Sequence, residues 1–254
     1  GGATGAVAPL VVMGIAALVM AAVAFGPDIS DAAIGGEPTA LVPMIAQRGL
    51  LILRGVAHGR SAHPAHTPVA DANNAILNAA NDLAKLDTFD WGPPHTLLGG
   101  CHAHVTQIQG GVARNVIPDR CEFYLDIRTI PGESHAALFE RLRESFDCEL
   151  TVHSDRLVPV ETAESEPIVG AVRRALPDAK PAGSPAMSDM VFLADVPCVK
   201  IGPGSPSRSH TPDEYVTVDE MAGGAAAYGR IIQAYFDIAG KAADASTGRE
   251  RIDA

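Results

Sequence analysis

The chain has 254 residues, 47% of them apolar, and a formal net charge of −11. This length and apolar content allow one large domain or two small ones with a sizeable core. The acidic balance and the lack of a Lys/Arg run argue against nucleic acid as a partner.

Residues 6–25 form a 20-residue apolar stretch within an uncharged segment, 1–27. The stretch is long enough to span a membrane. However, it is rich in Ala, Gly and Val, contains Pro9 and Gly14, and has no basic flank. We therefore expect a helix buried on all sides of an α/β domain, with a membrane or targeting segment as the alternative. Gly1 in place of Met is compatible with a fragment or a processed product.

The middle of the chain alternates between strand-like and helix-like patterns. Apolar residues at helical spacing and at alternate positions predict, in order, a strand at 50–57, a helix at 69–86, strands at 97–108 and 116–127, a helix at 134–146 and a strand at 149–153. This β-α-β-β-α-β order is typical of a ferredoxin-like fold. We place this α+β domain at residues 48–156.

The flanking segments predict an α/β domain made of residues 1–47 and 157–240. We expect a helix at 167–176, a helical turn at 188–194, a strand at 196–201 and an amphipathic helix at 218–239. The small and polar residues 241–254 predict a flexible tail. The four cysteines are scattered without a Cys-x-x-Cys pair, which indicates reduced thiols in a cytoplasmic protein, with disulfides in a secreted protein as the alternative.

Two turns in the flanking segments carry candidate metal ligands. Glu37 lies in Gly-Gly-Glu-Pro-Thr after a short apolar run, and His210 opens His-Thr-Pro-Asp after a Gly-Pro-Gly-Ser turn. A carboxylate at the end of a strand and a neutral imidazole on a rigid loop can both bind a metal, and a following carboxylate can orient the imidazole. The alternatives are a turn Glu and a surface His.

Together with the middle segments 59–64, 110–119 and 126–132, these turns resemble the zinc-dependent family of acetylornithine deacetylase, succinyl-diaminopimelate desuccinylase and aminoacylase. That family also includes carboxypeptidases and dipeptidases. The resemblance runs from Gly35 to the helix after Val218. It implies an α/β zinc-hydrolase domain that carries an inserted lid, residues 48–156, through which two subunits dimerise. It also implies that Glu37 and His210 each ligate one zinc of a pair, with cobalt as an alternative metal.

The resemblance further implies roles for four residues that face the substrate. His63 would reach the partner subunit and donate a hydrogen bond to the oxygen that becomes negative during attack on the amide. Arg128 would clamp a substrate carboxylate in bidentate fashion, with Asn115 and the Gly204 amide beside it. The alternatives are an exposed His cluster, a hairpin-turn Asn and a surface Arg.

Two further features carry weaker expectations. Ser188 and Asp189 match a Ser-Asp pair of the same family, and we expect them only to support the site. His102 and His104 share one face of a predicted strand, which we interpret as a half-exposed lid strand, with a metal-binding patch as the alternative.

The family's remaining catalytic groups have no counterpart in the chain. They are an early His, a bridging Asp and a Glu-Glu pair whose first Glu is the general base. No His precedes His58, and the only acids before Glu37 are Asp28 and Asp31. Two ligands do not hold a catalytic zinc, which needs three protein groups and water. Either the sequence omits residues of a full enzyme, or the protein is a truncated, inactive relative.

We therefore expect a cytoplasmic, metal-dependent amide hydrolase that removes an acyl group from an N-acyl amino acid. By resemblance, an acetylornithine or acetyl-lysine deacetylase in amino-acid biosynthesis is nearest. One alternative is a carboxypeptidase or dipeptidase of the same family. A second is a non-catalytic homodimer that binds an amino-acid ligand or a protein partner, and a third is a form anchored in a membrane through residues 6–25.

Overall fold

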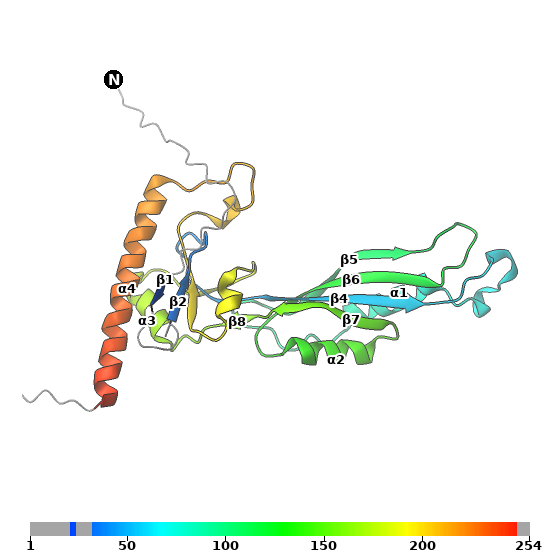
Figure 1. Ribbon diagram of the computed structural model, residues 1–254, viewed down its shortest axis with the longest axis horizontal. Coiled ribbons are helices and arrows are strands. Elements are labelled where there is room, and N and C mark those ends of the chain that lie inside the picture. The colour runs from blue at the N-terminus through cyan, green and yellow to red at the C-terminus, as the bar shows by residue number, and fades with distance from the viewer. Residues whose placement is uncertain (1–20, 24–31, 248–254) are drawn as a thin grey trace, which may run out of the picture. The chain divides into compact units, whose positions relative to one another are not determined.

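The computed structural model describes residues 21–23 and 32–247 and divides the chain into two compact units (Figure 1). The inserted unit comprises residues 48–160. The flanking unit comprises residues 1–47 and 161–254. Each unit has its own sheet.

The inserted unit is a four-stranded antiparallel sheet with the strand order β5-β6-β4-β7. Its elements in chain order are β4 (Gly49–His58), α1 (Ala75–Ala84), β5 (His102–Gly110), β6 (Arg120–Thr129), α2 (His135–Ser145) and β7 (Glu149–Leu157) (Figure 1). This is the predicted β-α-β-β-α-β order, so the expectation of a mixed α/β chain with a ferredoxin-like α+β domain is confirmed.

The core of the inserted unit lies on the face of the sheet that packs against α1 and α2. Side chains along β6 alternate between buried and half-buried, as the period of two requires. Phe123, Leu125 and Ile127 point into the core, while Glu122, Tyr124 and the other even-numbered residues lie on the opposite face. The sequence alternation at 123–127 therefore predicted the correct face.

Element boundaries in this unit differ from the predicted ones where side chains cap or bind the backbone. Helix α1 begins at Ala75 rather than 69, because the side chain of Asn74 accepts hydrogen bonds from the first free N–H groups. Strand β5 begins at His102 rather than 97. The guanidinium of Arg48 donates to the carbonyls of Leu98 and Gly100 and holds that segment in a turn.

In its described residues the flanking unit contains two α-helices and a six-stranded sheet, whose strand β8 begins at the last residue of the inserted unit. Its elements are β1 (Ala21–Val23), β2 (Ala32–Gly35), β3 (Met44–Gln47), β8 (Val160–Glu161), α3 (Pro167–Ala175), β9 (Ala182–Ser184), β10 (Cys198–Lys200) and α4 (Val218–Thr247). The strand order is β1-β2-β10-β3-β8, and β9 pairs with β3. Helix α3 packs against α4, where Arg174 and Asp237 form an ion pair (Figure 1).

Two expectations about the ends of the chain are wrong in part. Ala21–Val23 forms a strand paired with β2 instead of the end of a buried helix; the rest of 6–25 lies outside the described residues. Helix α4 continues to Thr247, so residues 241–247 are helical, since Ala and Lys there favour helix. Residues 248–254 lie outside the described part. None of the described helices combines the length and hydropathy needed to cross a membrane. All four cysteines carry free thiols, as expected.

The buried His135 at the start of α2 makes the inserted unit sensitive to pH. Its Nδ1 lies 2.8 Å from the carbonyl oxygen of Asp155 and its Nε2 2.9 Å from the hydroxyl of Thr129. A carbonyl only accepts, so Nδ1 carries the hydrogen, Nε2 accepts from Thr129, and the neutral ring satisfies both partners. Burial lowers the pKa of His135 below its ordinary value of 6.5.

We expect the free energy of unfolding to be independent of His135 above pH 6.5. Below that pH the unfolded state takes up the proton first, so stability falls as the pH drops toward the folded-state pKa, by up to about 1.4 kcal/mol per pH unit. Urea unfolding between pH 5 and 8 measures this dependence. His135→Gln should flatten this part of the curve, and equal slopes in both proteins would contradict the assignment.

Candidate functional site

The Glu37 turn and the Gly-Pro-Gly turn, far apart in sequence, meet in the flanking unit. Strands β2 and β10 are parallel neighbours, so the loops after them leave the same edge of the sheet. The N–H of Thr39 donates to the carbonyl of Gly202 (3.3 Å), and the N–H of Ala40 donates to that of Gly204 (2.7 Å). The N–H of Gly202 donates to the Thr39 hydroxyl (3.1 Å). Backbone hydrogen bonds therefore hold the two turns together.

The backbone of these loops is strained. Among the described residues, the non-glycine residues with positive φ are Ala40 (52°), Leu41 (60°) and His210 (61°), and all three belong to these loops. Gly204 has a φ of 82°, a conformation that glycine adopts without strain. Left-handed non-glycine residues are uncommon and cluster at functional sites, so this part of the flanking unit is the candidate site.

His210 is exposed, and a carboxylate fixes its backbone. The N–H of His210 donates to the Oε2 of Glu214 at 3.0 Å. Glu214 thus holds the loop, while the expected carboxylate partner of the imidazole ring is not seen in the described residues. Arg208 anchors the loop further by an ion pair with Glu220 and by stacking over the ring of Tyr215, 4.4 Å from its centroid.

Burial and nearby charges shift the pKa of Glu37. Burial raises the pKa of Glu37 above its ordinary value; Lys200 opposes the rise, Asp189 adds to it and His210 opposes it. The loop that carries Glu37 and the loop that carries His210 follow neighbouring parallel strands and leave the same edge of the sheet. The role of the two side chains as metal ligands stays a prediction.

A buried polar network joins Lys200, Gln47 and Ser188, of which only Ser188 was expected from the sequence to support the site. Lys200 is only 4% exposed, and its Nζ donates to the Oε1 of Gln47 (3.3 Å) and to the carbonyl of Ala186 (3.0 Å). The hydroxyl of Ser188, the residue directly before Asp189, donates to the same Oε1 (2.6 Å). Burial lowers the pKa of Lys200, and Glu37 opposes that shift. The sequence signal that could have indicated this network is Lys200, a charged residue inside the apolar run 196–201.

The described donors do not fit a catalytic zinc by themselves. Within residues 21–23 and 32–247, no three His, Cys, Asp or Glu side chains converge closely enough to hold a metal ion. The two predicted ligands, Glu37 and His210, are fewer than the three protein groups and a water that a catalytic zinc needs. The His102 and His104 rings lie 5.4 Å apart and likewise lack a third donor in the part described.

In the inserted unit, the structure brings the loops of His63 and Asn115 together. The N–H of Ile117 donates to the carbonyl of Ala62 at 2.8 Å. The Nδ1 of His63 accepts from the N–H of Ala65 (3.2 Å), so its Nε2 carries the ring hydrogen and can donate. Both predicted residues are exposed at this end of the sheet.

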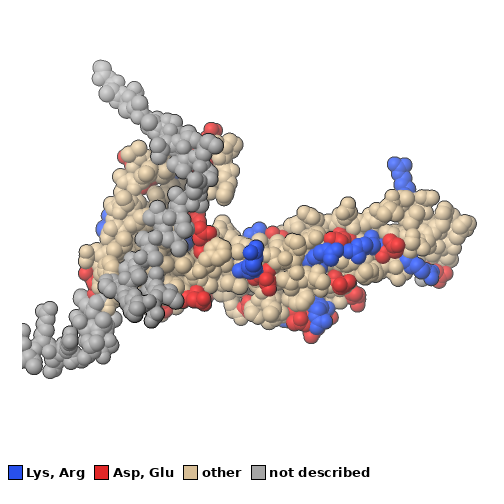
Figure 2. Space-filling view, in the orientation of Figure 1, with Lys and Arg blue, Asp and Glu red and all other residues tan. Residues whose placement is uncertain are grey.

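Arg128 lies at the other end of β6. Strand β4 pairs with β6 from Gly49↔Thr129 to His58↔Arg120, so about 26 Å of strand separates the Arg128 end from the His63 end. Arg128 donates to both carboxylate oxygens of Asp126, at 2.7 and 3.2 Å. The predicted clamp thus already holds a carboxylate from its own strand, which a substrate would have to share or displace. Basic and acidic side chains are intermixed on the face shown in Figure 2.

The contact between the two turns predicts a strong effect of a single methyl group. A Cβ at Gly202 would lie 2.5 Å from the carbonyl oxygen of Glu37, whereas a Cβ at Gly35 meets Lys200 at an ordinary 3.8 Å. We expect Gly202→Ala to cost about 1–3 kcal/mol and to push the Glu37 turn away. Hydrogen exchange of the Thr39 and Ala40 amides should accelerate in Gly202→Ala and stay unchanged in Gly35→Ala. Equal protection in the two variants would contradict the coupling.

Comparisons with known proteins agree with this architecture. Residues 45–151 match the peptidase dimerisation domain model. The chain is 31% identical over 212 residues to an acetylornithine deacetylase of Myxococcus xanthus, covering 74% of this chain and 53% of the relative. It is 27% identical over 230 residues to a probable carboxypeptidase of Aspergillus oryzae, covering 82% and 52%. The chain therefore spans about half the length of the curated relatives it matches.

Solved structures show the same fold at low identity. An aminopeptidase PepT from Bacillus cereus matches with a TM-score of 0.67 and 18% identity, covering 82% of this chain and 58% of that structure. An M20 family metallo-carboxypeptidase from Sulfolobus solfataricus matches with a TM-score of 0.60 and 16% identity, covering 81% and 64%.

Proposed function

We propose a function from the premise that this chain belongs to the metallopeptidase and deacylase family of acetylornithine deacetylase, succinyl-diaminopimelate desuccinylase and aminoacylase. The proposed function is the hydrolysis of the amide bond of an N-acyl amino acid. The observation that carries the proposal is the meeting, at one edge of the flanking sheet, of the loop after β2, which contains Glu37, and the loop after β10, which contains His210. An N-acetylornithine-like substrate is supported by the acetylornithine deacetylases of Myxococcus xanthus and Edwardsiella ictaluri, 31% and 30% identical.

Several residues of the chain would have separate roles in this hydrolysis. Glu37 and His210 would contribute two of the three or more protein ligands that a catalytic metal needs. The Nε2–H of His63, from the partner subunit, would donate to the carbonyl oxygen as it becomes negative. Arg128 and the amide of Gly204 would hold the substrate carboxylate. Asn115 lies at the His63 end of the inserted unit and would therefore reach the carboxylate from the partner subunit, as His63 does.

Metal content and turnover test the proposal together. Protein purified with zinc or cobalt should bind metal and release ornithine from N-acetylornithine, and Glu37→Gln should lose both. The lack of a third described ligand favours a second candidate, a non-catalytic homodimer that binds an amino-acid ligand. Protein with no metal and no turnover, but with an intact dimer, would support that candidate.

We further propose that the inserted unit forms a homodimer through the β5 edge. Strand β5 is an edge strand whose side chains are almost all exposed, including Val105 and Ile108. Leu77 on α1 is also exposed. An unpaired edge with apolar side chains favours pairing with another chain, and the match to a peptidase dimerisation domain supports a second copy as the partner.

Ile108 should therefore control the dimer. Ile108 is 53% exposed on β5, and Val152 is 42% exposed on β7, the strand at the other edge. Because a two-fold interface would contain each substitution twice, we expect Ile108→Glu to weaken dimerisation at least about tenfold. Sedimentation velocity over a concentration series measures this. Val152→Glu is the matched control and should leave the dimer intact. If Val152→Glu gave monomers and Ile108→Glu did not, the interface would lie at the β7 edge and the proposal would be wrong.

A further inference from the structure

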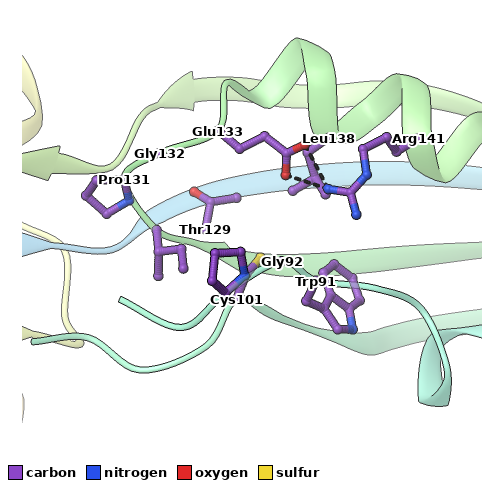
Figure 3. A pocket seen from close by; sticks show the side chains of 11 residues that line it. Trp91, Gly92, Cys101, Thr129, Pro131, Gly132, Glu133, Leu138 and Arg141 are labelled. Atoms are coloured by element: carbon purple, nitrogen blue, oxygen red, sulfur yellow. Dashed lines mark hydrogen bonds and ion pairs between the residues drawn. The ribbon is translucent and has the colours of Figure 1, made fainter. Parts of the chain in front are cut away.

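A pocket of about 230 Å³ opens in the inserted unit between α2 and the loop before β5 (Figure 3). The buried side chains of Ile130 and Leu138 form its apolar part, and the half-buried ring of Trp91 closes the side opposite α2. Glu133 and Arg141 lie on the α2 side (Figure 3). The pocket thus combines an apolar wall with one acidic and one basic group.

The pocket is held open by contacts within the protein. The Nη1 of Arg141 donates to both carboxylate oxygens of Glu133, at 2.8 and 2.9 Å, and its Nη2 donates to the carbonyl of Asp90. The guanidinium stacks over Phe89, 5.2 Å from the ring centroid, and Phe89 meets Trp91 edge to face at 4.8 Å. The loop and α2 are therefore positioned before any ligand arrives, which is typical of binding pockets.

We propose that this pocket binds a free α-amino acid with an apolar side chain. Such a molecule carries an ammonium and a carboxylate on one carbon, and Glu133 and Arg141 present the opposite charges side by side. A carboxylate offers about four acceptor sites and a guanidinium five donors, so each keeps capacity beyond the bonds they share. The ammonium binds Glu133, the carboxylate binds Arg141, and the side chain enters between Trp91 and Leu138.

The chemistry of the pocket disfavours other ligand classes. A purely apolar ligand would cover the ion pair without replacing its hydration, which costs free energy. A simple anion or cation would meet one like charge. The volume is below the usual range of drug-sized ligands, which limits the ligand to a small molecule.

This site is separate from the one proposed for amide hydrolysis. All of its lining residues belong to the inserted unit, and His63, Asn115 and Arg128 are not among them. Binding at this pocket needs neither metal nor turnover, so the two proposals can fail independently.

Trp91 is the single tryptophan of the chain and reports directly on the pocket. Titration of the metal-free protein with L-leucine should change the Trp91 emission in a saturable way. The analogues 4-methylpentanoate, which lacks the ammonium, and 3-methylbutylamine, which lacks the carboxylate, should bind about tenfold or more weakly. No saturable response to L-leucine, or equal affinity for the three compounds, overturns the proposal.

Variants separate this pocket from other sites. Glu133→Gln should weaken L-leucine at least about tenfold, because Gln still accepts from Arg141 but no longer offers a charge to the ammonium. Arg143→Met is the matched control on α2, since Arg143 pairs with the exposed Glu140, and it should bind as wild type does. Unchanged affinity in Glu133→Gln, or loss of the response in Glu37→Gln, overturns the assignment. Loss of hydrolysis with an unchanged titration bears on the proposed function alone.

Discussion

Phe123→Ala is expected to lower the free energy of unfolding of the inserted unit by about 3–5 kcal/mol. Phe123 is 0% exposed in the centre of β6 and is among the largest fully buried side chains. Truncation removes its apolar surface from the core and leaves a cavity that the surrounding strands fill only in part. Urea unfolding followed by far-UV circular dichroism measures the loss.

The partner of Phe123 across the sheet provides the control. Gly55 pairs with Phe123 in the β4–β6 register, and a Cβ at Gly55 would lie 2.1 Å from the tip of the Phe123 ring. Gly55→Ala alone should therefore destabilise the unit by about 1–3 kcal/mol. The double variant lacks the ring, so this clash is absent. The losses of stability in the two single variants should therefore sum to more than the loss measured in the double variant. Strict additivity would show that the ring does not fill the space above Gly55.

The fold of the inserted unit was predictable because its strands and helices are long enough to show a period. Ten residues of β6 alternate between the two faces, and α2 starts where Ser134 caps it. The short strands β3, β8 and β9 were missed, since two to four residues contain too few side chains to define a period. Their strand conformation comes from pairing with neighbours, which is a tertiary effect.

The candidate site was predictable to the level of its turns. Glycine, proline and one polar residue in each motif indicated where Glu37 and His210 lie. The network of Lys200, Gln47 and Ser188 was not predictable, because it joins three segments through buried side chains. The ion pair between Arg128 and Asp126 was not predicted, although residues two apart on a strand lie on the same face of the sheet.

A large effect on activity is expected from His63→Asn. If the Nε2–H of His63 donates to the developing oxyanion, its loss should lower kcat for N-acetylornithine by a factor of about 10²–10³, with a smaller change in KM. His66 is the matched control, since its ring lies 5.2 Å from that of His63 in the same exposed turn. His66→Asn should retain activity, and a similar loss in both variants would indicate damage to the turn rather than a lost donor.

A mixed dimer then decides whether His63 acts on its own subunit or on the partner. His63→Asn and Glu37→Gln should each be inactive alone. When the two variants are unfolded and refolded together, some dimers contain one protomer of each. In such a dimer one site combines the intact Glu37 of the His63→Asn protomer with the intact His63 of the Glu37→Gln protomer, and the other site carries both substitutions. Random pairing should therefore restore about a quarter of the sites, given two-fold symmetry. Recovery requires action across the interface, because a His63 that served its own subunit would leave every site of the mixture defective.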